Sequence, residues 1–175
     1  MLRCSTFIVC FLMAPLTAFG QSATDYSLND GRVRFSVAPD WLQIMEKKDG
    51  AMQAMIFQVP DTTAVGTDDT ASVTVKTHAI KNESEFTAIV QDEYLRSKEQ
   101  SGYERDGAAG DSNQHRYFVT RGATRYLIRD SFLLVPGVAV HIRCQRPLIS
   151  STPAAWNTAF DSACAKMVAS TKSGA

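Results

Sequence analysis

Hydrophobic and polar residues alternate with a period of two over much of the chain, and this pattern predicts β-strands. Residues 32–37 alternate strictly, as in a strand with one buried face. Residues 52–59 are apolar on both faces, which indicates a strand covered on two sides and a candidate for the centre of a sheet. Residues 21–31 and 60–70 are polar, and we expect loops there. The predicted strands are residues 32–37, a short strand containing Leu42 and Ile44, and residues 52–59, 71–80, 115–120, 125–135 and 138–145.

Two stretches change to helical spacing. Asn82 offers an N-cap with Glu85 three residues on, and we expect the helix that follows to end at Ser101-Gly102. Thr152 is the expected cap of a second helix, with Pro153 in its first turn. The apolar stripes of these helices are Phe86, Ile89, Val90 and Tyr94 in the first, and Trp156, Phe160, Cys164 and Met167 in the second.

Tight turns join the last three strands into two hairpins. Residues 121–124 link the first two strands. Pro136-Gly137 suits a type II turn between the last two, because proline sets φ at the first central position and glycine accepts a positive φ at the second. The pattern therefore predicts an α+β fold, an antiparallel β-sheet flanked by a mid-chain helix and a C-terminal helix.

The first twenty residues have the composition of a secretory signal peptide. Arg3 precedes an apolar stretch from Phe7 to Phe19, which is too short for a bilayer-spanning helix of ~20 residues. Small residues, Ala18 and Gly20, fit cleavage after Gly20. We therefore expect a signal peptide over residues 1–20, a single globular domain over residues 21–175, a periplasmic or secreted location, and no stable membrane span.

Two of the four cysteines, Cys4 and Cys10, lie in this predicted leader. The remaining pair, Cys144 and Cys164, would enter an oxidising compartment, where thiols tend to pair. Both lie on apolar faces that we expect to meet, one on the last strand and one on the last helix. We predict a disulfide that fixes this helix to the sheet. The alternatives are a metal pair or a reactive thiol, but two cysteines without a local histidine make a poor zinc site.

Charge is balanced overall but unevenly distributed. The 18 basic and 18 acidic residues cancel, which argues against a nucleic-acid binder driven by net charge. Residues 81–112 are rich in acids, whereas residues 115–146 carry arginines and no lysine. Because arginine suits bidentate contacts, one hypothesis is a partner-binding sheet face. The other, which we favour, is neutralisation by the acidic helix region. The predicted face consists of Arg116, Arg121, Arg125, Arg129 and Arg143.

The sequence contains no catalytic or cofactor-binding motif. It has no Gly-x-Ser-x-Gly elbow, and Gly107-Ala-Ala-Gly110 lacks the lysine and the helix of a phosphate loop. His78, His115 and His141 are widely separated and fit no metal spacing, so we interpret them as polar residues on the sheet surface. We therefore predict no catalytic residue, no metal and no cofactor.

The order of elements resembles the PsbP and Mog-type superfamily, including the small DcrB-like periplasmic proteins of bacteria. The resemblance rests on the opening strand with Phe35 and Pro39-Asp40-Trp41, the meander, the mid-chain helix, the antiparallel run, and the C-terminal helix with Trp156 and Phe160. It implies a PsbP-like α/β/α sandwich that serves as a non-catalytic binding or assembly module.

These observations together predict a secreted or periplasmic accessory protein that acts through contact with another protein, and not with nucleic acid. One alternative is a periplasmic immunity protein that neutralises a secreted bacterial toxin. A second is a hydrolase with an unrecognised site, which a deep pocket with converging histidine and carboxylate groups would favour.

Overall fold

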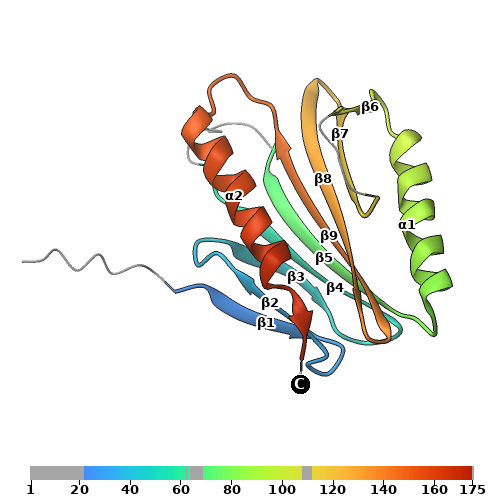
Figure 1. The fold of residues 1–175 in the computed structure, drawn as a ribbon. Coiled ribbons are helices and arrows are strands. Elements are labelled where there is room, and N and C mark those ends of the chain that lie inside the picture. Colours follow the sequence, from blue (N-terminus) through green and yellow to red (C-terminus); the bar gives the residue numbers. More distant parts are fainter. Residues whose placement is uncertain (1–21, 62, 64–68, 108–111, 175) are drawn as a thin grey trace, which may run out of the picture.

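A computed structural model describes residues 22–61, 63, 69–107 and 112–174 of the chain (Figure 1). The predicted leader at 1–20, most of the predicted loop at 60–70 and most of Gly107-Ala-Ala-Gly110 lie outside the described residues. The described chain forms two antiparallel sheets and two helices. The strands are β1 (Thr24–Leu28), β2 (Val33–Val37), β3 (Leu42–Lys47), β4 (Met52–Val59), β5 (Ala71–Ala79), β6 (Glu104–Arg105), β7 (Gln114–Arg121), β8 (Thr124–Val135), β9 (Val138–Pro147) and β10 (Lys172–Ser173), and the helices are α1 (Glu83–Lys98) and α2 (Ala154–Ser170).

The larger sheet has seven strands in the order β3-β4-β5-β9-β8-β7-β6. Four long neighbouring strands, β5, β9, β8 and β7, form its middle, and every neighbouring pair among them is antiparallel. The predicted turn at Pro136-Gly137 joins β8 to β9, and Gly137 has the positive φ, 73°, that we expected there. β3 and β6 form the two edges.

The two helices cover opposite faces of the larger sheet (Figure 1). α2 lies on the face that carries Val140, Ile142 and Cys144 of β9. The smaller sheet, β1-β2-β10, packs beside α2 on this face, where the rings of Tyr26 and Phe57 lie 5.0 Å apart at their centroids. α1 packs on the other face. The architecture is α+β with helices on both sides of an antiparallel sheet, which confirms the predicted fold class.

The predicted N-terminal signal of α1 is confirmed, but its predicted end is not. The side chain of Asn82 accepts a hydrogen bond of 3.0 Å from the backbone N–H of Glu85, as an N-cap does. Phe86 and Val90 are buried against the sheet. The helix ends at Lys98, before the predicted stop at Ser101-Gly102, and its C-cap is Glu99 in a right-handed helical conformation. Gly102, whose φ is 66°, lies in the turn beyond this cap.

The predicted cap of α2 is wrong. Pro153 occupies the N-cap position, and α2 begins at Ala154 without a side-chain cap. Thr152 instead donates its hydroxyl hydrogen to the carboxylate of Asp61, 2.9 Å away. The hydroxyl of Thr152, which we expected to cap the helix, therefore makes a tertiary contact instead.

Two predictions about strands are also wrong. Residues 24–28 form β1 and not a loop, because Tyr26 and Leu28 pack inward while their polar neighbours face outward. β4 is covered on both faces at Ala54 and Met55, as its composition indicated, but it lies second from the edge. Burial on both faces does not determine strand order, and β9 takes the central place.

The predicted disulfide is confirmed. Cys144 on β9 and Cys164 on α2 are bonded, with their Cα atoms 6.4 Å apart. Cys164 belongs to the expected stripe, since Phe160 and Met167 on the same side of α2 are also buried in the core. The bond fixes α2 to the centre of the larger sheet.

Candidate functional site

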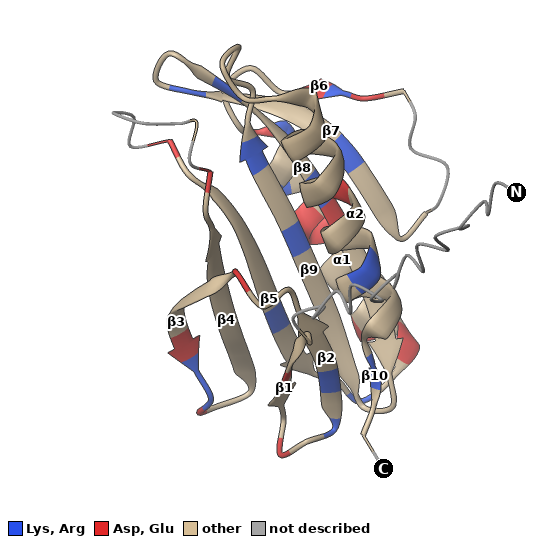
Figure 2. Cartoon of the chain, turned by 90° about the vertical axis from the view of Figure 1, so that its left-hand side faces the viewer, with Lys and Arg blue, Asp and Glu red and all other residues tan. Residues whose placement is uncertain are grey.

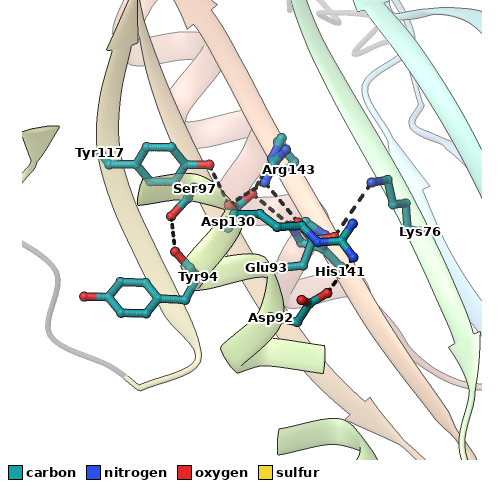
Figure 3. A network of polar contacts seen from close by, with 10 residues as sticks. Lys76, Asp92, Glu93, Tyr94, Ser97, Tyr117, Asp130, His141 and Arg143 are labelled. Carbon is teal, nitrogen blue, oxygen red and sulfur yellow. Dashed lines mark hydrogen bonds and ion pairs between the residues drawn. The ribbon is translucent and has the colours of Figure 1, made fainter. Parts of the chain in front are cut away.

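A cluster of charged groups lies buried between α1 and the larger sheet (Figure 3). Its centre is Asp130 of β8, which is 1% exposed. We call Asp130, Tyr117, His141, Arg143 and Glu93 the Asp130 cluster.

Asp130 accepts hydrogen bonds from three sides. Arg143 donates to it twice, from Nε to Oδ1 at 2.7 Å and from Nη2 to Oδ2 at 2.9 Å. The Nε2 atom of His141 lies 2.9 Å from Oδ1, and the hydroxyl of Tyr117 donates to Oδ2 at 3.0 Å. This bidentate arrangement satisfies the carboxylate within the protein.

Strand register places these groups together. Asp130 of β8 is directly opposite Arg143 of β9, and Phe132 is opposite His141. These residues share the face that α1 covers, since Phe132 packs with Phe86 and Val90 of the helix. The ring of Phe132 also stacks on that of His141, with centroids 4.5 Å apart.

The cluster links the sheet to α1. Glu93 of α1 lies 3.5 Å from Nη2 of Arg143 and 3.9 Å from Nζ of Lys76 on β5. The Glu93 side chain is 14% exposed and that of Arg143 is 19% exposed, so both are partly shielded from water. Arg143 therefore joins a carboxylate of the sheet to a carboxylate of the helix.

The charges of the cluster stabilise one another. Burial raises the pKa of Asp130, but the hydrogen bonds and charges of His141 and Arg143 outweigh it and hold this pKa far below its ordinary value. Burial and the neighbouring Asp130 charge together raise the pKa of the Tyr117 hydroxyl. Asp130 is thus ionised and Tyr117 neutral at any physiological pH.

Chemically, this arrangement is suited to holding α1 in place. The pairing of His141 with Asp130 has the composition of an acid–base pair, yet these side chains are only 3% and 1% exposed. A substrate has no access to atoms buried beneath a helix. Among the described residues, no group of three or more metal-ligating side chains is found.

The sequence interpretation of the histidines is wrong for His141, which is 2% exposed. His141 does lie on the polar face of β9, but α1 covers that face. His78 and His115 are half-buried on the same face. Burial lowers the pKa of both side chains and favours the neutral imidazole.

The five arginines of the predicted face lie on two faces of the sheet. Arg121 and Arg143 share the α1 side, whereas Arg116, Arg125 and Arg129 share the α2 side. Strand alternation separates them, because odd and even positions of one strand point in opposite directions. The structure therefore does not bring the five together.

Acids from residues 81–112 pair with three of these arginines, as the favoured neutralisation hypothesis expects. Arg143 meets Glu93, Arg116 lies 3.0 Å from Asp106, and Arg125 pairs with Glu104. The acids come from α1, from β6 and from Asp106 directly after β6. A partner-binding role of the arginines stays a prediction.

Apolar side chains gather at the opposite end of the sheet, on the edge strand β3. Figure 2 shows this strand at the border of the sheet. Leu42 is 57% exposed, Ile44 58% and Met45 39%, and Met52 on the neighbouring β4 is 40% exposed. We call these four residues the edge patch. The register places Leu42, Met45 and Met52 on the α1 side of the sheet.

Comparison with solved structures shows similar folds at low sequence identity. A mutant form of the protein Mog1 matches with a TM-score of 0.51 and 12% identity, over 86% of this chain and 95% of Mog1. The Ran-binding protein Mog1p of Saccharomyces cerevisiae has the same score and identity over 86% and 94%. LpqN, involved in cell envelope biogenesis of Mycobacterium tuberculosis, matches at TM-score 0.49 and 11% identity over 88% and 91%. No family model and no curated protein sequence matches.

The chain therefore shares the Mog-type fold, as its order of elements indicated. The finer resemblance to DcrB-like proteins stays a prediction. No helix within the described residues is long and apolar enough to cross a membrane.

Proposed function

We propose that this chain is a non-catalytic exported protein that binds another protein through the edge patch. The observation that carries the proposal is the exposure of four large apolar side chains on and beside a sheet edge. Single exposed apolar side chains are common on soluble proteins, whereas several of them grouped on one sheet edge are typical of an interaction surface.

The form of the edge indicates how the partner binds. β3 has an irregular register between Gln43 and Met45, so Ile44 has no pairing partner on β4. A bulge of this kind protects an edge from pairing with a foreign strand. We infer that the partner packs on the side chains of the patch and does not extend the sheet.

The fold is compatible with this role. Mog1p, which has the same fold, is a Ran-binding protein. Ran itself is not proposed as the partner here, since likeness at 12% identity concerns the fold alone.

Capture of the partner tests the proposal. We expect an affinity-tagged chain to retain a protein from the native periplasm, and the double substitution Leu42→Lys and Ile44→Lys to abolish retention. Both side chains are exposed, so the charges should weaken binding without unfolding the domain. Leu95→Lys is the matched control, because Leu95 is 58% exposed on α1, far from β3.

Two results would contradict the proposal: equal retention by wild type and edge variant, or equal loss in the Leu95 variant. Loss in an Arg125→Ala and Arg129→Ala variant alone would assign binding to the arginines. The identity of the retained protein separates the two roles, since a secreted toxin means an immunity protein and an envelope component means an accessory protein.

Export has its own test. The buried disulfide supports an oxidising compartment. We expect the exported protein to have the mass of residues 21–175 less two hydrogens. An intact N-terminus in the native protein would refute the leader.

A further inference from the structure

A second surface, on the smaller sheet, has the character of a ligand site. A hollow of about 640 Å³ lies over the outer face of β1, β2 and the end of α2. Arg34 of β2, Lys172 of β10 and Ser27 of β1 line it. The register places all three side chains in one cross-strand row, since Ser27 and Lys172 are both opposite Arg34. Figure 2 shows the basic positions of β2 and β10.

The two cations lie opposite each other without an acid between them. Like charges in directly opposed positions are destabilising, because their Cβ atoms are only ~5 Å apart. Among the described residues, neither cation forms an ion pair. Asp25 also lines the hollow, and its carboxylate accepts a hydrogen bond from the hydroxyl of Ser36 at 2.7 Å and not from either cation.

The backbone holds Arg34 in place. Its Nε donates to the carbonyl oxygen of Gly31 at 3.4 Å. The segment after β10 runs close to Gly31. A Cβ added to Gly174 would collide with the carbonyl oxygen of Gly31 and approach Nε of Arg34. The N–H of Gly174 donates to the carbonyl of Arg32 at 2.8 Å, which fixes the segment on β2. One side of the guanidinium is therefore anchored.

We propose that this hollow binds a phosphate monoester group. The carrying juxtaposition is Arg34 opposite Lys172, with the hydroxyl of Ser27 beside them. A phosphate monoester has a charge of about −1.5 to −2 at neutral pH. Such a ligand balances two cations better than a ligand with a single carboxylate would. Arginine supplies fork-shaped donors, lysine a compact charge, and serine a further hydrogen bond.

Binding of inorganic phosphate, measured by titration calorimetry, tests the site on the full mature chain. We expect the double substitution Arg34→Gln and Lys172→Gln to weaken binding by about tenfold or more, since it removes two charge-assisted contacts. Arg32→Gln with Lys47→Gln removes the same charge outside the hollow and should leave binding unchanged. Ser27→Asp, which adds a negative charge to the hollow, should also abolish binding.

The source of the phosphate group is distinguished by a second arm. Co-sedimentation with phosphatidylcholine vesicles that contain phosphatidic acid would show a lipid headgroup if the same variants lose it. The proposal is overturned if neither probe binds, if both double variants lose binding equally, or if acetate competes as well as phosphate. The edge patch is untouched in these variants, so this test is independent of partner capture.

Discussion

At the residue scale, Asp130 is the buried charge that joins β8 to β9. It is a fully buried carboxylate whose negative charge pairs with the guanidinium of Arg143 and which lies within hydrogen-bond distance of His141. Breaking such a pair leaves the remaining charge buried without compensation. The stability of the fold therefore depends strongly on the carboxylate of Asp130.

We predict that Asp130→Asn lowers the free energy of unfolding by about 3–5 kcal/mol, because Arg143 loses its ionised partner. Urea denaturation of the oxidised mature protein measures this. Glu104→Gln is the control. It removes a carboxylate that also pairs with arginine but is 63% exposed, and it should cost less than ~1 kcal/mol. Similar losses in the two variants would show that burial of the pair is not what matters.

The same residue predicts a dependence on pH. The folded pKa of Asp130 lies below its ordinary value of 3.8, so the unfolded chain takes up its proton first as the pH falls. The stabilisation is therefore complete above about pH 5 and decreases below about pH 4. The stability difference between wild type and Asp130→Asn should shrink from pH 5 to pH 3. Parallel profiles would contradict this.

The Asp130 cluster was accessible to sequence reasoning only in part. The predicted turn at Pro136-Gly137 fixes the register of β8 and β9, and counting outward from it places Asp130 opposite Arg143. What the sequence did not reveal is that α1 covers this phase of the sheet. A polar face on an alternating strand is equally consistent with exposure to solvent and with contact to another polar element.

At the scale of elements, the disulfide determines how α2 is attached. The helix has no side-chain cap at its first turn, and its buried stripe contacts the core through Phe160, Cys164 and Met167. Cross-linking to β9 restricts the unfolded chain, because it closes a loop between cysteines separated by 20 positions in sequence.

We predict that Cys164→Ala lowers the stability of the oxidised protein by roughly 3 kcal/mol, measured as a lower melting temperature. A reductant should shift the wild type by a similar amount and leave the variant unchanged. If the reductant shifts both proteins equally, or neither, the bridge does not stabilise the fold.

Local sequence signals predicted the individual elements well, but contacts between residues distant in sequence were predicted poorly. The cap at Asn82 and the turn at Gly137 depend on residues a few positions apart, and both are confirmed. β1 was missed because its pairing with β2 compensates for its polar composition. Thr152 was misassigned because its partner, Asp61, is distant in sequence.

At the scale of the whole molecule, the two ends of the larger sheet differ. The centre of the sheet carries the Asp130 cluster, and towards β6 Arg116 and Arg125 pair with acids of the segment that follows α1. The other end carries the edge patch, whose apolar surface is open. From sequence, an arginine face was one hypothesis for a binding surface and neutralisation of the arginines was the favoured one. The edge patch was not predicted, because exposure of β3 depends on its position at the sheet border.

The proposed role of the edge patch is tested most directly by hydrogen exchange on the captured complex. We predict that partner binding slows amide exchange in residues 42–47 and 52–56 and leaves α1 and the arginine-bearing strands unchanged. Protection confined to β7 and β8, with β3 exchanging as in the free protein, would contradict the account and assign the partner to the arginines.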